Sequence, residues 1–241
     1  MSTPPLVDRI ALVTGASRGI GYATALALAK AGAHIVAVAR TVGGLEELDD
    51  AIGAIGGSAT LVPLDLKDTP GMVRLAAALE ARYARLDVMV GNAGILGPLS
   101  PLDHVEPKAW EEALAVNVTA NWHLIRAMNA LLQRSTAARV VFVTSGIVAH
   151  PRAYWGPYAI SKAALEALAR TYAAETASTK VRVNLFNPGA TRTRMRATAM
   201  PGEDPEALKT PDQVAEKILG LCLPQLQETG KLYDYRQSLP A

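Results

Sequence analysis

Short apolar runs, several of them rich in β-branched residues, alternate along this chain with longer stretches rich in alanine and leucine. The short runs have strand length and the longer stretches have helix length. Regular alternation of this kind predicts an α/β fold, a doubly wound parallel sheet of about seven strands with helices on both faces. The expected strands are 10–13, 35–39, 60–63, 88–90, 140–144, 181–186 and 231–235, and the expected helices are 19–31, 44–55, 70–84, 107–133, 157–177 and 211–222.

The composition fits a single domain that covers residues 1–241. Half of the residues are hydrophobic but only 5% are aromatic, so alanine, valine, leucine and isoleucine must do the packing. Aliphatic cores of this kind suit parallel strands buried between helices. Cys222 is the only cysteine, which excludes an intrachain disulfide and a thiolate metal cluster. We expect Cys222 to be buried and the protein to hold no metal.

The charge balance argues against two classes of partner. Lysine and arginine number 24 against 22 acidic residues, and no long run of one sign occurs. We therefore expect no binding to nucleic acid and no electrostatic attachment to a membrane. No apolar run reaches the roughly 18 residues that suggest a membrane span. The N-terminus also lacks the pattern of a secretion signal, so a cytoplasmic protein is expected.

A glycine-rich turn follows the first expected strand and opens the first expected helix. It reads Thr14-Gly15-Ala16-Ser17-Arg18-Gly19-Ile20-Gly21. Glycines allow a tight turn and a close approach of the backbone, and the free N–H groups at a helix start favour a phosphate. The spacing differs from the commonest dinucleotide-binding pattern, so a generic tight turn is the alternative. The position between strand and helix favours phosphate binding.

The helix expected at 157–177 carries Tyr158 and Lys162 near its start. Residues four apart on a helix lie on the same face, one turn from each other. An ammonium beside a phenol favours the phenolate, so we expect Lys162 to lower the Tyr158 pKa from its usual value of about 10. The pair alone is a weak signal, because this spacing is common by chance.

Together these motifs resemble the short-chain dehydrogenase/reductase family. The resemblance rests on the glycine turn, the Asn92-Ala93-Gly94 turn, Asn117, Ser145 and the Tyr158–Lys162 pair. Ser145 lies 13 residues before Tyr158 and 28 after Asn117, spacings typical of the family. The match runs from about residue 9 to residue 193, and the block 187–211 resembles a bacterial subgroup labelled YciK-like.

The resemblance implies a Rossmann-like fold and NAD(P)-dependent oxidoreductase activity on a small carbonyl or secondary-alcohol substrate. Tyr158 would be the general acid in reduction and the base in oxidation, and Lys162 would bind the nicotinamide ribose. Ser145 would bind the substrate oxygen, and Asn117 would hold a water in the proton relay. Each residue alone has a simpler alternative. Asn117 could pin its helix, Ser145 could end a strand, and Lys162 could lie in solvent.

The resemblance also assigns a cofactor-binding set, in which one position distinguishes NADP(H) from NAD(H). An NAD enzyme of this fold usually ends its second strand with an acidic residue, but here Ala39 takes that place and Arg40 follows. Because Arg40 and Arg18 can pair with a 2′-phosphate, we expect NADP(H) to be preferred, with NAD(H) as the alternative. The set is Gly15, Ser17, Arg18, Gly19, Ile20, Gly21, Arg40, Asp65, Leu66, Asn92, Ala93, Gly94, Tyr158, Lys162, Pro188, Gly189, Thr191 and Thr193.

Two departures from the family pattern affect the pocket. The usual Asn-Asn-Ala-Gly turn begins with Gly91 here, which removes one family hydrogen bond. The usual Asp-Gly-Gly after the last strand is also missing from 229–235, so the sequence does not define the C-terminal edge of the pocket. His150, Arg152 and Trp155 are candidates for the pocket wall, and Trp155 is the strongest of them.

The segment around 190–211 is expected to form a substrate lid. It follows a strand end, where ligand sites form in α/β folds, and its prolines and glycine at 201–205 provide breaks. Arg192, Arg194 and Arg196 are open to two interpretations. They meet an acidic group of the substrate, such as an acyl-carrier-linked compound would supply, or they form a solvated basic face.

The helices expected at 107–133 and 157–177 are rich in small and apolar residues. In the family these helices form a twofold interface, so we expect a homodimer or homotetramer. Close packing on the sheet is the alternative explanation. The alternative function is a non-catalytic, cofactor-binding regulatory protein on the same fold. A methyl-donor enzyme is a weaker alternative, because it leaves the Ser–Tyr–Lys set unexplained.

Overall fold

A computed structural model describes residues 3–236, so the two ends of the expected 1–241 domain lie outside the described residues. The strands are β1 (Ile10–Thr14), β2 (His34–Ala39), β3 (Ala59–Pro63), β4 (Val88–Gly91), β5 (Arg139–Val143), β6 (Arg182–Asn187) and β7 (Leu232–Asp234). They form one sheet in the order β3-β2-β1-β4-β5-β6-β7, and every neighbouring pair is parallel. The expected α/β fold is confirmed.

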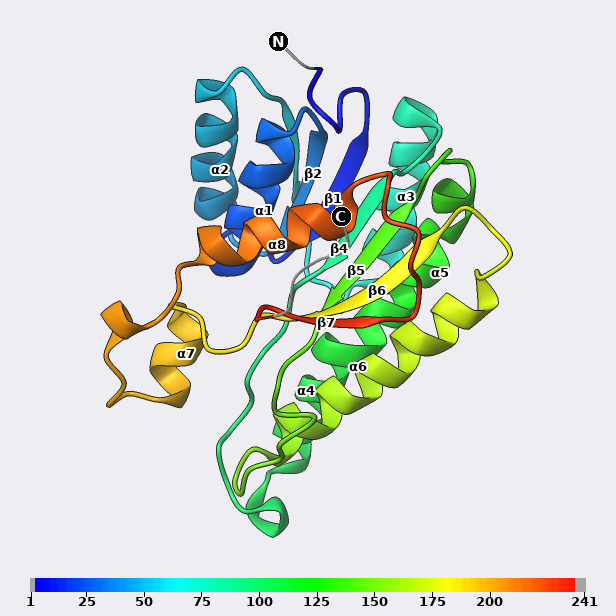
Figure 1. Cartoon of the computed structure of the whole chain (residues 1–241). Helices are drawn as coiled ribbons and strands as arrows, with labels where there is room; N and C mark the ends of the chain where they lie inside the picture. The colour runs from blue at the N-terminus through cyan, green and yellow to red at the C-terminus, as the bar shows by residue number, and fades with distance from the viewer. Residues whose placement is uncertain (1–2, 237–241) are drawn as a thin grey trace.

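Helices cover both faces of this sheet. They are α1 (Gly19–Lys30), α2 (Val42–Ala54), α3 (Thr69–Tyr83), α4 (Pro107–Leu114), α5 (Ala120–Gln133), α6 (Gly156–Glu175), α7 (Arg194–Ala199) and α8 (Pro211–Cys222). Helices α1, α2 and α8 pack on one face, and α3, α5 and α6 pack on the other (Figure 1). None of the helices within residues 3–236 is long and apolar enough to cross a membrane. Cys222, at the end of α8, is buried as expected.

The strand order reverses beside β1, and this reversal fixes where a ligand can bind. Strand β2 pairs with one edge of β1 and β4 with the other. The segments that leave β1 and β4 at their carboxyl ends therefore diverge to opposite faces of the sheet. In parallel α/β sheets, ligands bind in the crevice at such a point. The glycine turn and the Asn92-Ala93-Gly94 turn both begin at this crevice.

The structure is helical over the whole of the helix expected at 107–133, but it contains a π-helical turn that the sequence did not predict. Helix α4 ends at Leu114, a π-helical turn occupies Ala115–Thr119, and α5 begins at Ala120. A π turn contains one residue more than an α turn, and such turns are frequent at functional sites. Asn117 lies at the centre of this turn.

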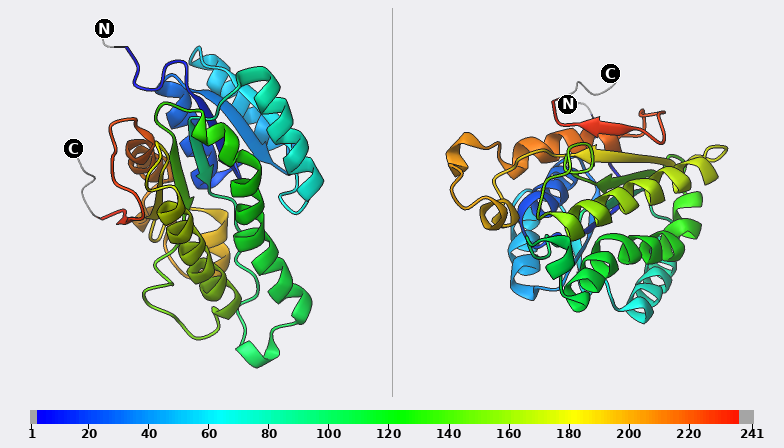
Figure 2. Two further views of the ribbon diagram at one scale, coloured as in Figure 1. Left: turned by 90° about the vertical axis from the view of Figure 1, so that its right-hand side faces the viewer. Right: turned by 90° about the horizontal axis from the view of Figure 1, so that it is seen from below.

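The expected lid contains two short helical elements. Helix α7 follows Thr193, whose hydroxyl accepts a hydrogen bond from the N–H of Arg196 at 3.2 Å. A 3₁₀ turn spans Pro205–Ala207. The segment projects from the body of the molecule (Figure 2). It ends at α8, where Thr210 and Gln213 form a capping box.

Candidate active site

A cavity of about 1170 Å³ opens at the carboxyl ends of the strands. The turns after β1, β4 and β5, the end of β2, the start of α6 and the lid all contribute to its wall. Almost all the residues expected to act in catalysis or cofactor binding lie here. These are Gly15, Ser17, Arg18, Gly19, Ile20, Arg40, Asp65, Leu66, Asn92, Ala93, Gly94, Ser145, Tyr158, Lys162, Pro188, Gly189, Thr191 and Thr193.

Two of the expected site residues, Gly21 and Asn117, lie behind the cavity wall instead. Gly21 packs against the glycine turn, where a side-chain atom would overlap the carbonyl oxygen of Gly15. Asn117 is fully buried. Both residues reach the cavity only through the residues in front of them.

Thr14 ties the glycine turn to the turn after β4, although the site prediction left it out. Its Oγ1 accepts hydrogen bonds from the N–H groups of Asn92 (3.0 Å) and Ala93 (3.1 Å) and donates one to the Val90 carbonyl (3.3 Å). The Asn92 amide donates to the Thr14 carbonyl at 2.9 Å. These bonds hold two turns of the cavity wall together. The threonine directly before Gly15 is the sequence signal that could have identified it.

One end of the cavity is positively charged. Arg18 on the glycine turn and Arg40 after β2 both line it, and both are exposed. Neither has an ion-pair partner within residues 3–236. Strand β2 ends at Ala39, so no carboxylate stands at the strand end. Guanidinium groups placed in this way can bind a phosphate through bidentate, charge-assisted hydrogen bonds.

Tyr158 and Lys162 lie one turn apart on α6, as expected, and both are buried. The Lys162 Nζ lies 5.8 Å from the centre of the Tyr158 ring and donates a hydrogen bond of 2.8 Å to the Val143 carbonyl. The Trp155 ring packs edge-on to Tyr158, with ring centres 6.2 Å apart. Trp155 therefore forms the wall beside the phenol. The other two wall candidates, His150 and Arg152, also line the cavity and are exposed.

The pKa values of this pair differ from the sequence expectation. Burial is the largest influence on Tyr158 and raises its pKa, while a side-chain hydrogen bond with Ser145 acts in the opposite direction. Burial also lowers the pKa of Lys162 to about 8. The expectation that Lys162 lowers the Tyr158 pKa is wrong for the protein alone, because burial penalises both charged forms. Burial therefore favours the protonated phenol, which is the form that a proton donor needs.

The Asn117 side chain joins the turn after β4 to helix α6. Its Oδ1 accepts a hydrogen bond from the Ile95 N–H at 2.8 Å, and its Nδ2 donates to the Ile95 carbonyl and to Ser161 Oγ, both at 2.9 Å. Ser161 Oγ donates in turn to the Tyr158 carbonyl at 2.9 Å. This network fixes the start of α6, where Tyr158 lies. A relay water on Asn117 stays a prediction.

Helix α5 explains why glycine stands at position 91. A side-chain atom on Gly91 would come within 2.5 Å of the Phe142 ring and 2.7 Å of the Asn121 Oδ1. Asn121 is buried, and its Nδ2 donates to the Asn117 carbonyl at 2.9 Å. An amide from α5 thus occupies the space beside β4 that a side chain of the strand would fill.

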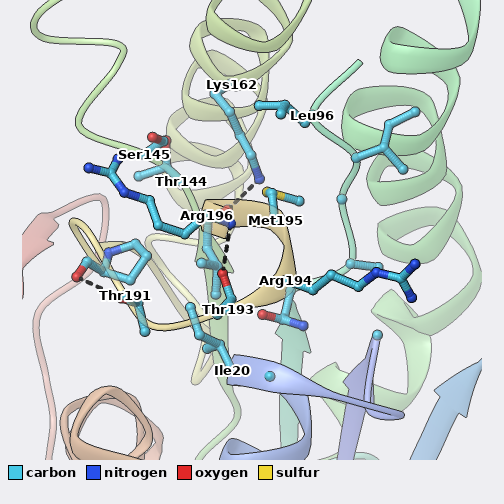
Figure 3. Close-up of a pocket in the computed structure, with 18 of the residues that line it drawn as sticks. Ile20, Leu96, Thr144, Ser145, Lys162, Thr191, Thr193, Arg194, Met195 and Arg196 are labelled. Atoms are coloured by element: carbon cyan, nitrogen blue, oxygen red, sulfur yellow. Dashed lines mark hydrogen bonds between the residues drawn. The ribbon is translucent and has the colours of Figure 1, made fainter. Parts of the chain in front are cut away.

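The lid forms the far wall of the cavity, and two of its arginines are ion-paired. Arg196 binds Glu203 through Nε at 2.5 Å and Nη2 at 2.6 Å, and Arg192 Nη1 lies 2.9 Å from Glu206. Both arginines are therefore paired with glutamates within the lid, and they do not form the solvated basic face that was one of the two interpretations. Arg194 lines the cavity without an acidic partner in the described part of the chain. Figure 3 shows Arg194 and Arg196 extending in opposite directions.

The C-terminal edge of the cavity consists of residues that the sequence did not predict. Lys209 Nζ donates to the Ala190 carbonyl at 2.6 Å and lies 4.5 Å from the centre of the Tyr235 ring. Because the family motif is missing from this stretch, no local signal marks them. The residues that form this edge are Lys209, Asp234, Tyr235 and Arg236.

The cavity suits a dinucleotide that carries an additional phosphate. The start of α1 presents free backbone N–H groups beside the glycine turn. The lid faces this turn closely, since a side-chain atom on Gly19 would lie 3.6 Å from the Thr193 Cγ2. Gly19 and the Thr191–Thr193 stretch line one part of the cavity wall, where both could contact a pyrophosphate, and Arg18 and Arg40 could bind the additional phosphate.

Comparison with known proteins agrees with this geometry. Residues 9–204 match the family described as short chain dehydrogenase. The chain is 39% identical to the oxidoreductase YciK of Escherichia coli K12, over 95% of this chain and 92% of the relative. It is 38% identical to the rhamnolipids biosynthesis 3-oxoacyl-[acyl-carrier-protein] reductase of Pseudomonas aeruginosa, over 85% and 80% of the two chains. A crystal structure of a short chain dehydrogenase from Shigella flexneri, complexed with NADP, gives a TM-score of 0.94 at 37% identity and covers 98% of this chain and 100% of its own. The chain belongs to the short-chain dehydrogenase/reductase family.

Proposed function

We propose that this protein is an NADP(H)-preferring oxidoreductase that transfers a hydride between the nicotinamide and a carbonyl or secondary-alcohol substrate. The proposal rests on one observation: Ser145, Tyr158 and Lys162 line the same cavity as Arg18 and Arg40, which have no ion-pair partner among the described residues. Family membership supports the reaction class, and NADP in the related S. flexneri structure supports the choice of cofactor. The bound nicotinamide would supply or accept the hydride.

The protein itself has to orient the substrate oxygen and move one proton. Ser145 Oγ would donate a hydrogen bond to that oxygen, and the Tyr158 hydroxyl would protonate it during reduction. The raised pKa of Tyr158 favours this direction at neutral pH. Alcohol oxidation needs the phenolate, so its rate would rise with pH. Lys162 is charged below about pH 8 and would hold the nicotinamide ribose.

The arginines of the lid favour a substrate that carries an acidic group. Arg194 faces the cavity without an acidic partner among the described residues, whereas Arg192 and Arg196 are neutralised by glutamates. An acyl-carrier-linked compound has a phosphate on the arm that bears its thioester. The P. aeruginosa relative is named as a reductase of such a compound. Acyl-carrier-linked carbonyl compounds are therefore the first substrate class to test, with simple carbonyls beside them.

We also propose that the protein assembles as a homodimer or homotetramer through α5 and α6. These helices run side by side on one face of the molecule (Figure 2). Trp122 on α5 and Ile160 on α6 are 45% and 40% exposed, and a twofold mate would cover them. Sedimentation should show a mass of at least two chains. A monomer mass at every concentration would rule the assembly out.

A panel of carbonyl compounds tests the activity. NADPH oxidation, followed by its absorbance, should occur with at least one class and should be slower with NADH. Calorimetric titration with NADPH supplies the second measurement. Tight binding of NADPH together with no turnover over the whole panel would support the non-catalytic regulatory protein instead.

A further inference from the structure

Glu166 is a buried carboxylate that the proposed chemistry does not use. It is 4% exposed and lies on α6, one turn beyond Lys162 and on the same face. Its Oε1 accepts a hydrogen bond of 2.9 Å from Thr144 Oγ1, and Thr144 is itself 1% exposed. Its Oε2 pairs with Arg170 Nη2 at 2.9 Å. Glu166 does not line the cavity.

Stability alone does not account for this arrangement. A buried carboxylate loses its hydration, and Arg170, whose side chain is 47% exposed, offsets that loss only in part. Replacement of such a buried polar group by a well-packed apolar one is often neutral or stabilising. The buried positions around Glu166 on α6 include the polar Ser161 and Lys162 toward the cavity and the apolar Leu165 and Ala169 in the core. An apolar pair at 144 and 166 would extend this core.

The position of Thr144 indicates what the pair does. Thr144 directly precedes Ser145, and Figure 3 shows the two side by side in the cavity wall. The Thr144 N–H donates to the Phe186 carbonyl at 2.9 Å, which ties the backbone to β6. One residue earlier, the Val143 carbonyl accepts the hydrogen bond from Lys162. Side chains of α6 therefore hydrogen-bond to both residues that precede Ser145: Lys162 to Val143 and Glu166 to Thr144.

We propose that the Thr144–Glu166 hydrogen bond positions Ser145, so that its hydroxyl meets both the Tyr158 phenol and the substrate oxygen in one arrangement. Thr144 and Glu166 are positioning residues in this account, because they act through Ser145. The inference rests on the proposed function of Ser145 and Tyr158. The proposal explains why the Glu166 carboxylate is buried, although it takes no direct part in the proposed reaction.

The proposal has a consequence for the pH dependence of the reaction. The hydrogen bond from Ser145 acts to lower the Tyr158 pKa. A misplaced Ser145 therefore leaves this pKa higher, and alcohol oxidation then needs a higher pH to reach its half-maximal rate. The charged and titratable groups around the phenol stay unchanged in the variants below. Lys162 on α6 lies beside the phenol, and His150, Arg152, Arg194 and Arg196 are among the other charged or titratable residues that line the same cavity.

Two matched pairs of variants test the proposal. Thr144→Val removes the hydroxyl at nearly constant shape, and Thr144→Ser keeps it. Glu166→Leu removes the acceptor, and Glu166→Gln keeps one. We expect Thr144→Val and Glu166→Leu to lower kcat by about ten- to hundredfold, the scale of a small misplacement of a reacting group. Thr144→Ser and Glu166→Gln should stay close to the unmodified protein, and the NADPH Kd should not change in any variant.

The double variant Thr144→Val/Glu166→Leu separates positioning from stability. We expect its Tm to equal or exceed that of the unmodified protein, while its kcat stays low and its oxidation profile moves to higher pH. If the double variant has the same kcat and the same pH profile as the unmodified protein, the proposal is overturned. A loss of kcat in all four single variants that follows their loss of Tm would also overturn it.

Ultraviolet titration of Tyr158 gives a measurement that needs no turnover. The difference between each variant and its Tyr158→Phe counterpart reports the ionisation of this one phenol. A higher Tyr158 pKa in Thr144→Val, restored in Thr144→Ser, supports the proposal, and an equal pKa in both refutes it. Failure of the proposed function would appear separately, as an unmodified protein that reduces no carbonyl compound.

Discussion

The two walls of the cavity are held in place by different kinds of interaction. The wall made of the glycine turn and the turn after β4 depends on hydrogen bonds to Thr14, which is 1% exposed. The lid depends on the Arg192–Glu206 and Arg196–Glu203 ion pairs, whose side chains are 22–76% exposed. Loss of a buried hydrogen-bond partner costs about 1–3 kcal/mol, whereas exposed ion pairs contribute about 0–1 kcal/mol each. The wall beside the glycine turn is therefore preformed, and we expect the 190–211 segment to open at a lower cost in free energy.

If the chemistry depends on the preformed wall and not on the lid, the largest effect should come from Tyr158→Phe. The substitution removes only the hydroxyl, so we expect kcat to fall by about 10²–10⁴-fold. The NADPH Kd and the Tm should stay unchanged, since the network of Asn117 and Ser161 holds the start of α6 through its backbone. Steady-state kinetics would measure the loss. Near-normal turnover would transfer the proton-donor role to another residue.

Thr14→Val tests whether the preformed wall depends on one hydroxyl. The valine leaves the N–H groups of Asn92 and Ala93 without their acceptor, so we expect a loss of about 1–3 kcal/mol in the free energy of unfolding. Denaturant titration would measure it, and Thr14→Ser is the control that keeps the hydroxyl. Equal stability of the valine variant would show that other contacts fix this wall.

Arg40→Ala sharpens the comparison at the adenosine end of the same wall. Loss of a charge-assisted bond to the 2′-phosphate should reduce the preference for NADPH over NADH by about ten- to hundredfold. The ratio of kcat/KM for the two cofactors measures this preference. Arg74→Ala is the matched control, because Arg74 is exposed on α3 and pairs with Asp68 away from the cavity. An unchanged ratio in Arg40→Ala would make Arg40 an ordinary surface residue.

Lys162 should make cofactor binding depend on pH. Its pKa is lowered to about 8, so the ammonium is present below this pH and is lost above it. The NADPH Kd should therefore rise above pH 8, by at most about tenfold per pH unit for a single proton. Fluorescence titration would follow it. Lys162→Met should bind weakly at every pH, and an equally steep pH dependence in that variant would assign the titration to another group.

Glu203→Gln should have the smallest effect on stability and affects only the lid. The free energy of unfolding should change by less than about 1 kcal/mol, while proteolysis between Arg192 and Lys209 should become faster because Arg196 loses its charged partner. Saturating NADPH should slow this cleavage in the unmodified protein, since Thr193 faces the glycine turn. Cleavage unaffected by NADPH would show that the lid does not respond to the cofactor.

Most strand positions could be predicted from the sequence because most strands are short apolar runs that are also buried, as in β1 and β5. The role of Thr14 could not, since its partner Asn92 lies 78 residues away. The π turn could not be predicted for the same reason. Asn117 bonds to Ile95, 22 residues earlier, and the periodicity of apolar residues along a helix does not reveal that contact. The motifs located Tyr158 and Lys162, but the direction of their pKa shifts depends on burial, which is a property of the whole fold.

The π turn at Ala115–Thr119 also sets the rotational phase between α4 and α5. Each residue advances an α-helix by about 100°, so the extra residue of this turn decides which side of α5 meets the sheet. Deletion of any one residue within it would rotate Leu124, Met128 and Leu131 out of the core they now fill. It would carry Asn121 away from Gly91 by the same rotation. The length of this turn is therefore less replaceable than most of the side chains in it.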